Sequence, residues 1–147
     1  MRPIFTVSWA VATSDAAEID RINILQASRL AMRRAIEQLS PTPDFLLIDA
    51  VKVDLLIPQK GIIRGDAICP TIAAASILAK VARDACMREW DAVYPHYGLA
   101  RHKGYPTHEH LDSLAMHGPT PHHRMTYEPL RQLPLFARGA EASSSCR

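Results

Sequence analysis

The sequence predicts an α/β fold in which helices pack on a sheet. Segments with strand-like and helix-like hydrophobic patterns alternate along the chain, which is typical of layered α/β proteins. The run 45–51 is continuously apolar apart from one carboxylate, as expected of a central buried strand. The chain has 147 residues, of which 48% are hydrophobic, enough for one domain with a buried core. We predict one domain over residues 1–130, followed by a flexible tail, 131–147.

The first half of the chain predicts a strand, a helix and a second strand. Residues 4–12 are rich in β-forming side chains and predict a strand. Ser14 offers an N-cap for a helix that extends to about Leu39. Its apolar positions recur at helical spacing: Ile22, Leu25, Met32, Ile36 and Leu39. The two prolines in 40–43 end this helix, and the buried strand at 45–51 follows.

The second half predicts the longest helix and a shorter one. Residues 54–66 contain Pro58 and Gly61 and predict a strand or hairpin at the sheet margin. The pattern from Thr71 to about Tyr94 predicts a helix whose alanine-rich start permits close packing. Thr107–His117 predicts a short helix, which Thr107 would cap and Gly118 would end.

Composition excludes several classes of protein. No stretch approaches the roughly 18–20 apolar residues that cross a bilayer, and we expect no membrane association. The three cysteines are Cys69, Cys86 and Cys146, which form neither a disulfide framework nor a paired metal motif. This favours a cytoplasmic location. A net charge of +2 does not by itself indicate a polyanionic partner.

Asp49 and Asp84 are the candidate catalytic carboxylates. An unpaired charge among apolar residues is costly, so Asp49 either caps the next turn at a solvent-exposed strand end or binds a metal there. Asp84 shares one face of the long helix with Ser76 and Lys80. It therefore forms either a surface salt bridge with Lys80 or, if it converges with Asp49, part of a Mg²⁺ or Mn²⁺ site.

The region from His96 to His123 contains all seven histidines of the chain. Their spacing matches no standard zinc pattern and no cysteine lies nearby, so we interpret the region as a solvated loop region with some cations near phosphates. Arg101, His102 and Lys103 precede Gly104 and Tyr105. Such a loop can contact a phosphate and stack on a base, although it is also a common turn.

Four blocks of the sequence together resemble bacterial ribonuclease HII. They appear in that family's order over about residues 7–130: Glu18–Ala27, Gly65–Ala67 with Thr71–Asp84, His102–Thr107, and Gly118–Arg124. The second block is the most specific of the four.

The resemblance implies an RNase H-like fold, with a mixed central sheet flanked by helices, and endonucleolytic cleavage of RNA that is paired with or embedded in DNA. The family uses four acids around divalent metal, Mn²⁺ or Mg²⁺. By motif match, Asp49 is the third acid and Asp84 the fourth. Tyr105 matches the tyrosine that packs on the nucleotide at the RNA–DNA junction. Lys80, Arg101, His102 and Lys103 would accompany it in nucleic-acid binding.

One family motif is absent from the sequence. The family's first strand carries Asp-Glu-Ala-Gly-Arg-Gly, which supplies two acids and the loop that senses the ribose 2′-hydroxyl. Before Asp44 the acids here are Asp15, Glu18, Asp20 and Glu37, all in the predicted helix region. We therefore expect a chain that lacks the first strands of the family fold, with weak metal binding and impaired activity. The alternative is a non-catalytic remnant that binds nucleic acid or the sliding clamp.

The predicted tail contains a short motif of its own. Gln132, Leu133, Leu135 and Phe136 resemble the pentapeptide with which bacterial replication and repair proteins bind the sliding clamp. The alternative is that these apolar side chains pack back on the domain.

Overall fold

The computed structural model describes residues 6–131. The candidate clamp residues Gln132, Leu133, Leu135 and Phe136 lie outside this range, so their assignment stays a prediction, as does the predicted tail. The described residues form two compact units. The first unit contains the residues up to Ser14 together with Ile22–Ala82, and the second contains Asp15–Arg21 together with the residues from Arg83 onward.

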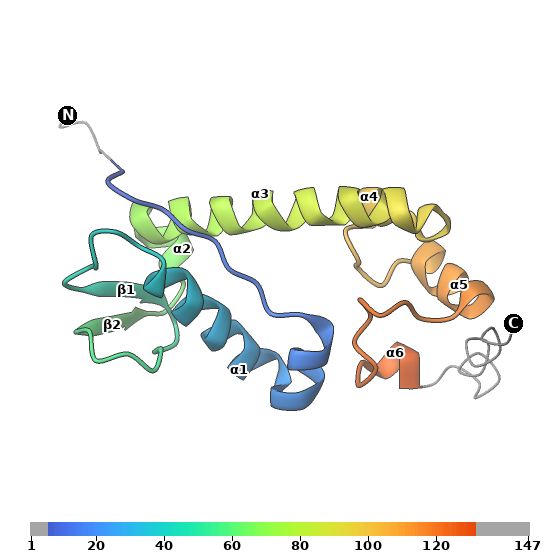
Figure 1. The fold of residues 1–147 in the computed structure, drawn as a ribbon, viewed down its shortest axis with the longest axis horizontal. Coiled ribbons are helices and arrows are strands. Elements are labelled where there is room, and N and C mark those ends of the chain that lie inside the picture. The colour runs from blue at the N-terminus through green and yellow to red at the C-terminus, as the bar shows by residue number, and fades with distance from the viewer. Residues whose placement is uncertain (1–5, 132–147) are drawn as a thin grey trace, which may run out of the picture. The chain divides into compact units, whose positions relative to one another are not determined.

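Helices and two short strands make up the described chain (Figure 1), and the predicted α/β class is confirmed. The elements are α1 (Ala16–Glu37), β1 (Leu46–Asp49), β2 (Gln59–Ile62), α2 (Gly65–Ile68), α3 (Pro70–Val93), the 3₁₀ turn η1 (Pro95–Tyr97), α4 (Leu99–His102), α5 (His108–His117) and α6 (Glu128–Arg131).

Helix α1 begins with a capping box and is interrupted at Asn23. Asp15 Oδ1 accepts a hydrogen bond from the Glu18 N–H at 2.7 Å, and Glu18 Oε2 accepts one from the Asp15 N–H at 3.3 Å. The cap is thus one residue later than predicted, and Ser14 Oγ instead donates to the Ala27 carbonyl at 3.0 Å. Asn23 has φ 67° and its side chain accepts from the Gln26 N–H at 3.1 Å. It therefore caps the second part of the helix.

The first unit contains a parallel strand pair. Leu46 lies opposite Gln59 and Asp49 opposite Ile62, so the two strands end together. The strand predicted within 54–66 is confirmed as β2, whereas the hairpin alternative is wrong. In β1, Leu46 and Ile48 are buried with Val53, and α1 packs on this group through Met32 and Ile36. Leu47 faces the other way and is 42% exposed, so β1 alternates instead of being buried on both faces as predicted.

The strand predicted at 4–12 is wrong in its described part. Residues 6–15 have no regular secondary structure. They are held by side chains: Arg34 donates to the Thr13 carbonyl at 3.2 Å, and Ser8 Oγ accepts from the Ser40 N–H at 3.3 Å. Strand preference depends on a neighbour to pair with, and these residues pair with no strand in the described chain.

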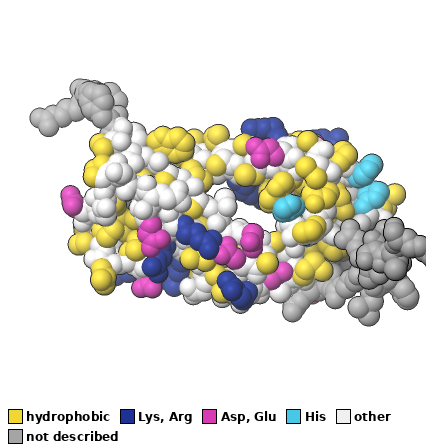
Figure 2. Space-filling view, in the orientation of Figure 1, with side chains coloured by type: hydrophobic (Ala, Val, Ile, Leu, Met, Phe, Trp, Pro, Cys, Tyr) yellow, Lys and Arg dark blue, Asp and Glu magenta, His cyan; other side chains and the backbone are white. Residues whose placement is uncertain are grey.

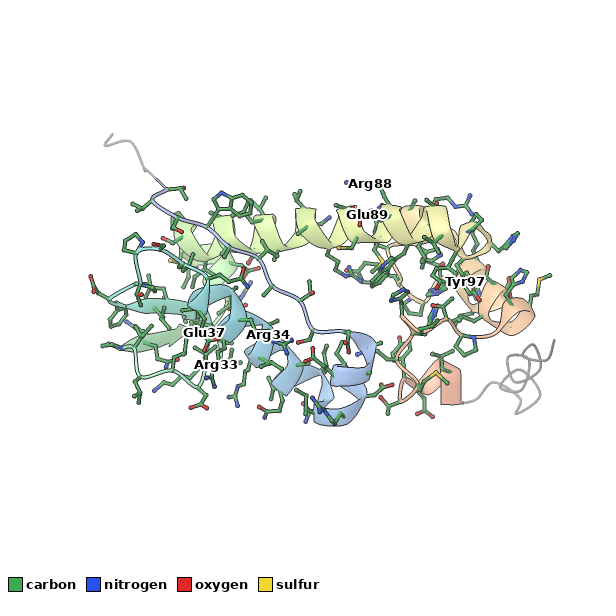
Figure 3. The ribbon with its side chains drawn as sticks, viewed as in Figure 1. Arg33, Arg34, Glu37, Arg88, Glu89 and Tyr97 are labelled. Atoms are coloured by element: carbon green, nitrogen blue, oxygen red, sulfur yellow. The ribbon has the colours of Figure 1, made fainter. Side chains whose placement is uncertain are left out.

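The second unit has a core of its own. Tyr97, Leu99, Leu114 and Leu130 are buried together, with Trp90, Tyr94 and Leu111 packed against them. Figure 3 shows Tyr97 among the side chains beside α5, and its hydroxyl donates to the Gly118 carbonyl at 2.6 Å. Asp20 accepts hydrogen bonds from the backbone N–H of Met125 at 2.6 Å and of Thr126 at 3.2 Å. These bonds attach the first turns of α1 to this unit.

Many apolar side chains of the first unit reach its surface. Figure 2 shows hydrophobic side chains over the strand region. The most exposed include Val7, Trp9, Leu56, Ile63 and Ile68. Across the part of the chain that the structure describes, no helix combines the length and apolar character needed to span a bilayer.

We expect the two faces of β1 to differ in stability measurements. Ile48→Ala should lower the free energy of unfolding by about 2–4 kcal/mol, because it removes a buried side chain that helix α1 packs against. Leu47→Ala, on the exposed face of the same strand, should cost under about 1 kcal/mol. Urea unfolding monitored by circular dichroism measures both. Equal costs would contradict the burial described for this strand.

Candidate functional site

Asp49 is the last residue of β1 and lies opposite Ile62, the last residue of β2. Shortly after Ile62 the chain enters α2. The residue after Asp49, Ala50, has φ 56°, and Arg64 before α2 also has φ 56°. Between these two turns, the Gly65 N–H donates a 2.8 Å hydrogen bond to Asp49 Oδ1. The carboxyl ends of parallel strands are where α/β proteins tend to place ligand sites. Asp49 is half-buried, and this hydrogen bond fixes one of its two oxygens.

Gly65 permits this close approach because it has no side chain. A Cβ atom at Gly65 would come within 2.6 Å of Ile72 Cδ1 and within 3.5 Å of Asp49 Oδ1. The start of α2, the start of α3 and the Asp49 carboxylate therefore meet around one buried glycine. Both interpretations of Asp49 fit this geometry, since the carboxylate accepts a bond from the turn and also lies at the strand edge.

Asp66 is the residue that the sequence reasoning did not single out. It follows Gly65 directly, is exposed, and lies in the first turn of α2. Consecutive Cα atoms are about 3.8 Å apart, so the bond between Gly65 and Asp49 brings Asp49 and Asp66 to the same strand edge. The signal in the sequence was a glycine-aspartate pair directly after a short strand, within the block Gly65–Ala67.

Asp84 and Lys80 lie on helix α3, as predicted. Asp84 belongs to the second unit and Asp49 to the first, so the convergence of their carboxylates stays a prediction. Each of Lys80 and Asp84 has an interaction partner. Nowhere within residues 6–131 do three or more histidine, cysteine, aspartate or glutamate side chains gather in a metal-binding arrangement.

The loop that carries Tyr105 is held in place by Arg83 on helix α3. Lys103 and Gly104 both have positive φ, 53° and 76°, which turns the chain sharply before Tyr105. Arg83 Nη2 donates to the Lys103 carbonyl at 2.8 Å, and the guanidinium carbon lies 5.2 Å from the centre of the Tyr105 ring. Tyr105 itself is 61% exposed. An exposed ring beside a cation is able to stack on a base.

Three neighbouring residues that were predicted to bind nucleic acid have partners within the second unit. Arg101 forms an ion pair with Glu109 and remains mostly exposed. Lys103 Nζ donates to the Ala100 carbonyl. His102 is buried, and both of its ring nitrogens bond to the backbone, with Nδ1 accepting from the Gly104 N–H at 3.2 Å and Nε2 donating to the Tyr97 carbonyl at 2.6 Å. In this conformation His102 presents no ring nitrogen to a phosphate.

Three histidines form a connected group, so the prediction of a solvated region is wrong for this part. His102 and His110 are buried and their rings stack with centroids 4.5 Å apart. His110 Nε2 lies 3.1 Å from His123 Nε2, and His110 Nδ1 lies 3.0 Å from the Tyr105 carbonyl. His123 Nδ1 accepts from the Thr120 N–H at 3.0 Å. These bonds connect α5, the Tyr105 loop and the turn at Thr120.

Burial also sets the charge of this group. Burial, helped by repulsion from His110, lowers the pKa of His123 to about 4. The pKa of His110 is lowered as well, mainly by burial. Both histidines are therefore neutral near pH 7.

Comparison with known proteins identifies the fold and then the family. The crystal structure of the ribonuclease H2 from Pyrococcus horikoshii superimposes with a TM-score of 0.66 at 22% identity, covering 85% of this chain and 67% of that one. The fold is accordingly RNase H-like, as predicted. The family model described as "Ribonuclease HII" matches residues 5–129. The chain belongs to the ribonuclease HII family.

Curated relatives agree with this assignment. The protein named ribonuclease HII from Solibacter usitatus is 60% identical over 125 residues, which is 85% of this chain and 55% of the relative. That from Myxococcus xanthus is 57% identical over 139 residues, 94% of this chain and 47% of the relative. The chain thus spans about half the length of the curated relatives it matches.

We expect stability to fall as the solution is acidified below about pH 6.5. The unfolded chain binds a proton at His123 near the ordinary histidine pKa of about 6.5, whereas the folded chain binds it only near pH 4. Between these values the unfolded state holds more protons, so the stability present above pH 6.5 is progressively lost. Urea midpoints at pH 7 and pH 5, with ring NMR of His123, measure this.

The control is His123→Asn, whose side-chain oxygen can still accept from the Thr120 N–H. It should lose stability less steeply over this range. A His123 titration midpoint near pH 6.5 in the folded protein would contradict the prediction.

Proposed function

We propose that this chain is an endoribonuclease of the ribonuclease HII type, which hydrolyses the phosphodiester at ribonucleotides in RNA–DNA hybrids or embedded in duplex DNA. Membership of the family supports the class of enzyme. The observation that carries the proposal is the 2.8 Å hydrogen bond from Gly65 to Asp49, because it brings the backbone next to Asp66 against the Asp49 carboxylate.

Asp49 and Asp66 are the residues that would hold the divalent metal. Carboxylate oxygens are the donors that Mg²⁺ and Mn²⁺ prefer, so the donor set fits these ions. The Gly65 N–H orients Asp49 Oδ1, and the second oxygen of Asp49 would be available as a ligand. When bound, two such ions would supply an activated water and stabilise the departing 3′ oxygen.

Asp84 is the acid that the motif match put forward, and its role remains a proposal. Asp66 is the stronger candidate because it lies in the same unit as Asp49 and follows the residue that binds it. The printed sequence contains no Asp-Glu-Ala-Gly-Arg-Gly segment, which supplies the family's first two acids. We therefore propose that the 147-residue chain binds metal weakly and cleaves slowly. The alternative remains a non-catalytic chain that only binds nucleic acid or the clamp.

The Tyr105 loop is the proposed contact with the nucleic acid. The exposed Tyr105 ring would stack on a base or sugar, while Arg101, Lys103 and Lys80 would contribute positive charge toward phosphates. His102 is buried under this loop's backbone and would support the loop instead of touching the duplex. We also propose that the protein is cytoplasmic. A contact with the sliding clamp through Gln132, Leu133, Leu135 and Phe136 is a further part of the proposal.

Activity assays test the assignment of the acids. With Mn²⁺ and a duplex containing one ribonucleotide, we expect little cleavage by the 147-residue chain and clear cleavage once an N-terminal segment with the missing motif is added. In that longer protein, Asp49→Asn and Asp66→Asn should each lower kcat about 100-fold, as loss of a charge-stabilising group does in other enzymes. Asp112→Asn, exposed on α5, is the control and should change little.

The same series includes Asp84→Asn. A loss of activity as large as that of Asp49→Asn would restore Asp84 as a metal ligand. Unchanged activity of Asp66→Asn would refute the pairing of Asp49 with Asp66. A longer protein that binds the duplex but never cleaves it would favour the non-catalytic alternative.

Binding assays test the role of Tyr105. Tyr105→Ala should weaken binding to the duplex about 5- to 100-fold, the range for loss of one stacked base, whereas Tyr105→Phe should keep most of the affinity. Tyr127 is a matched control, because Arg124 lies 4.9 Å from its ring in the same unit. Fluorescence anisotropy measures the affinity. If Tyr127→Ala weakens binding as much as Tyr105→Ala, stacking by Tyr105 is not the cause.

A further inference from the structure

The hydrogen bonds of His110 and His123 assign a single proton arrangement to both rings. The Thr120 N–H can only donate, so His123 Nδ1 accepts and carries no proton. At the neutral ring's other end, Nε2 therefore carries the proton and donates to His110 Nε2. That leaves the proton of His110 on Nδ1, where it donates to the Tyr105 carbonyl. Each donor in this series meets an acceptor.

From this series we propose that His110 and His123 are positioning residues for Tyr105. His123 fixes the tautomer of His110, and His110 in turn holds the backbone carbonyl of the residue whose ring is exposed for stacking. The inference rests on the proposed contact between Tyr105 and the nucleic acid. It assigns a role in duplex affinity to one buried and one half-buried histidine.

The surroundings of the two rings favour this one arrangement. His110 is buried and stacks on His102, whose own Nδ1 accepts from the Gly104 N–H beside Tyr105. His123 lies 5.5 Å from the Tyr97 ring, and Thr120 Oγ1 lies 2.8 Å from His123 Nδ1. A second proton on His123 would point at the Thr120 N–H, and one on His110 would point at the His123 N–H.

Arg83 and the histidines hold the same loop at two carbonyls. Arg83 binds the Lys103 carbonyl and His110 binds the Tyr105 carbonyl. Since Lys103 and Gly104 both have positive φ, the loop has an unusual backbone path that needs such contacts to persist. The Tyr105 backbone also donates to the His102 carbonyl at 2.9 Å and accepts from the Thr107 N–H at 2.8 Å. Loss of the His110 contact would remove the side-chain bond to the Tyr105 carbonyl while leaving the Arg83 contact in place.

The first test uses the protein without substitutions. Ring ¹⁵N NMR at pH 7 should show His123 protonated at Nε2 and His110 protonated at Nδ1. NOEs between the Arg83 side chain and the Tyr105 ring report the placement of the ring. The opposite tautomer at either histidine would overturn the proposal, whether or not the protein binds a hybrid.

The second test uses variants of His110 and an RNA–DNA hybrid without divalent metal. His110→Phe keeps a ring that can stack on His102 but removes the donor, and it should weaken binding about tenfold, within the range for one stacked base. His110→Asn can place an N–H where Nδ1 lies and should stay within about threefold of wild type. His108→Phe, exposed on the same helix, is the control.

A double-mutant cycle separates positioning from general support of the fold. If His110 acts through Tyr105, His110→Phe should change affinity less than about twofold in a Tyr105→Ala background. Full additivity of the two substitutions would overturn the proposal. If His110→Phe does not fold, the same cycle is run with His123→Phe and the tautomer measurement stands. A wild-type protein that does not bind the hybrid would refute the proposed function, and the NMR result alone would then decide the positioning.

Discussion

The Asp49 carboxylate organises the first unit through a single hydrogen bond. It is half-buried at the end of a strand, where an unsatisfied charge would be costly, and the Gly65 N–H satisfies one of its oxygens. Because β2 ends opposite Asp49, that bond also fixes where the chain leaves the sheet and enters α2. A Cβ atom at Gly65 would press on the Ile72 side chain at the start of α3, which would then have to move. The hydrogen bond from Gly65 therefore joins the end of β1 to the start of α2, where Asp66 lies.

The second unit depends on hydrogen bonds of a different kind. Its neutral histidines connect the helix α5, the turn at Thr120 and the loop of Tyr105 without any charge. A neutral imidazole is both a donor and an acceptor. In a series of hydrogen-bonded histidines, the proton position on one ring therefore fixes the proton position on the next. Protonation of both rings would place two donors face to face, and burial lowers the pKa of both His123 and His110. Both rings are therefore neutral near pH 7.

Two basic residues around the Tyr105 loop are engaged in contacts within the second unit. Arg101 is paired with Glu109, and Arg83 is used to hold the Lys103 carbonyl and the face of Tyr105. An ion pair lowers the net positive charge of the surface around it. The main exposed feature of the Tyr105 loop is therefore the aromatic ring of Tyr105. The loop is shaped by backbone contacts, which leaves its tyrosine side chain accessible.

The sequence by itself determined the three longer helices and the family. Hydrophobic periodicity and a capping threonine are local properties, so α3 and α5 were predicted within a few residues, and four motif blocks were enough to indicate ribonuclease HII. The predicted strand at 4–12 is wrong over its described residues, 6–12, because a strand needs a partner that local pattern does not supply. Asp66 was not predicted as a candidate acid. Its place near Asp49 depends on the hydrogen bond between Gly65 and Asp49, which are sixteen positions apart in the sequence. The roles of the histidines were also hidden, because a tautomer is set by the donors and acceptors around the ring. Only the tertiary structure brings these together, since hydrogen bonding in a buried site depends on which groups meet and not on their order in the chain.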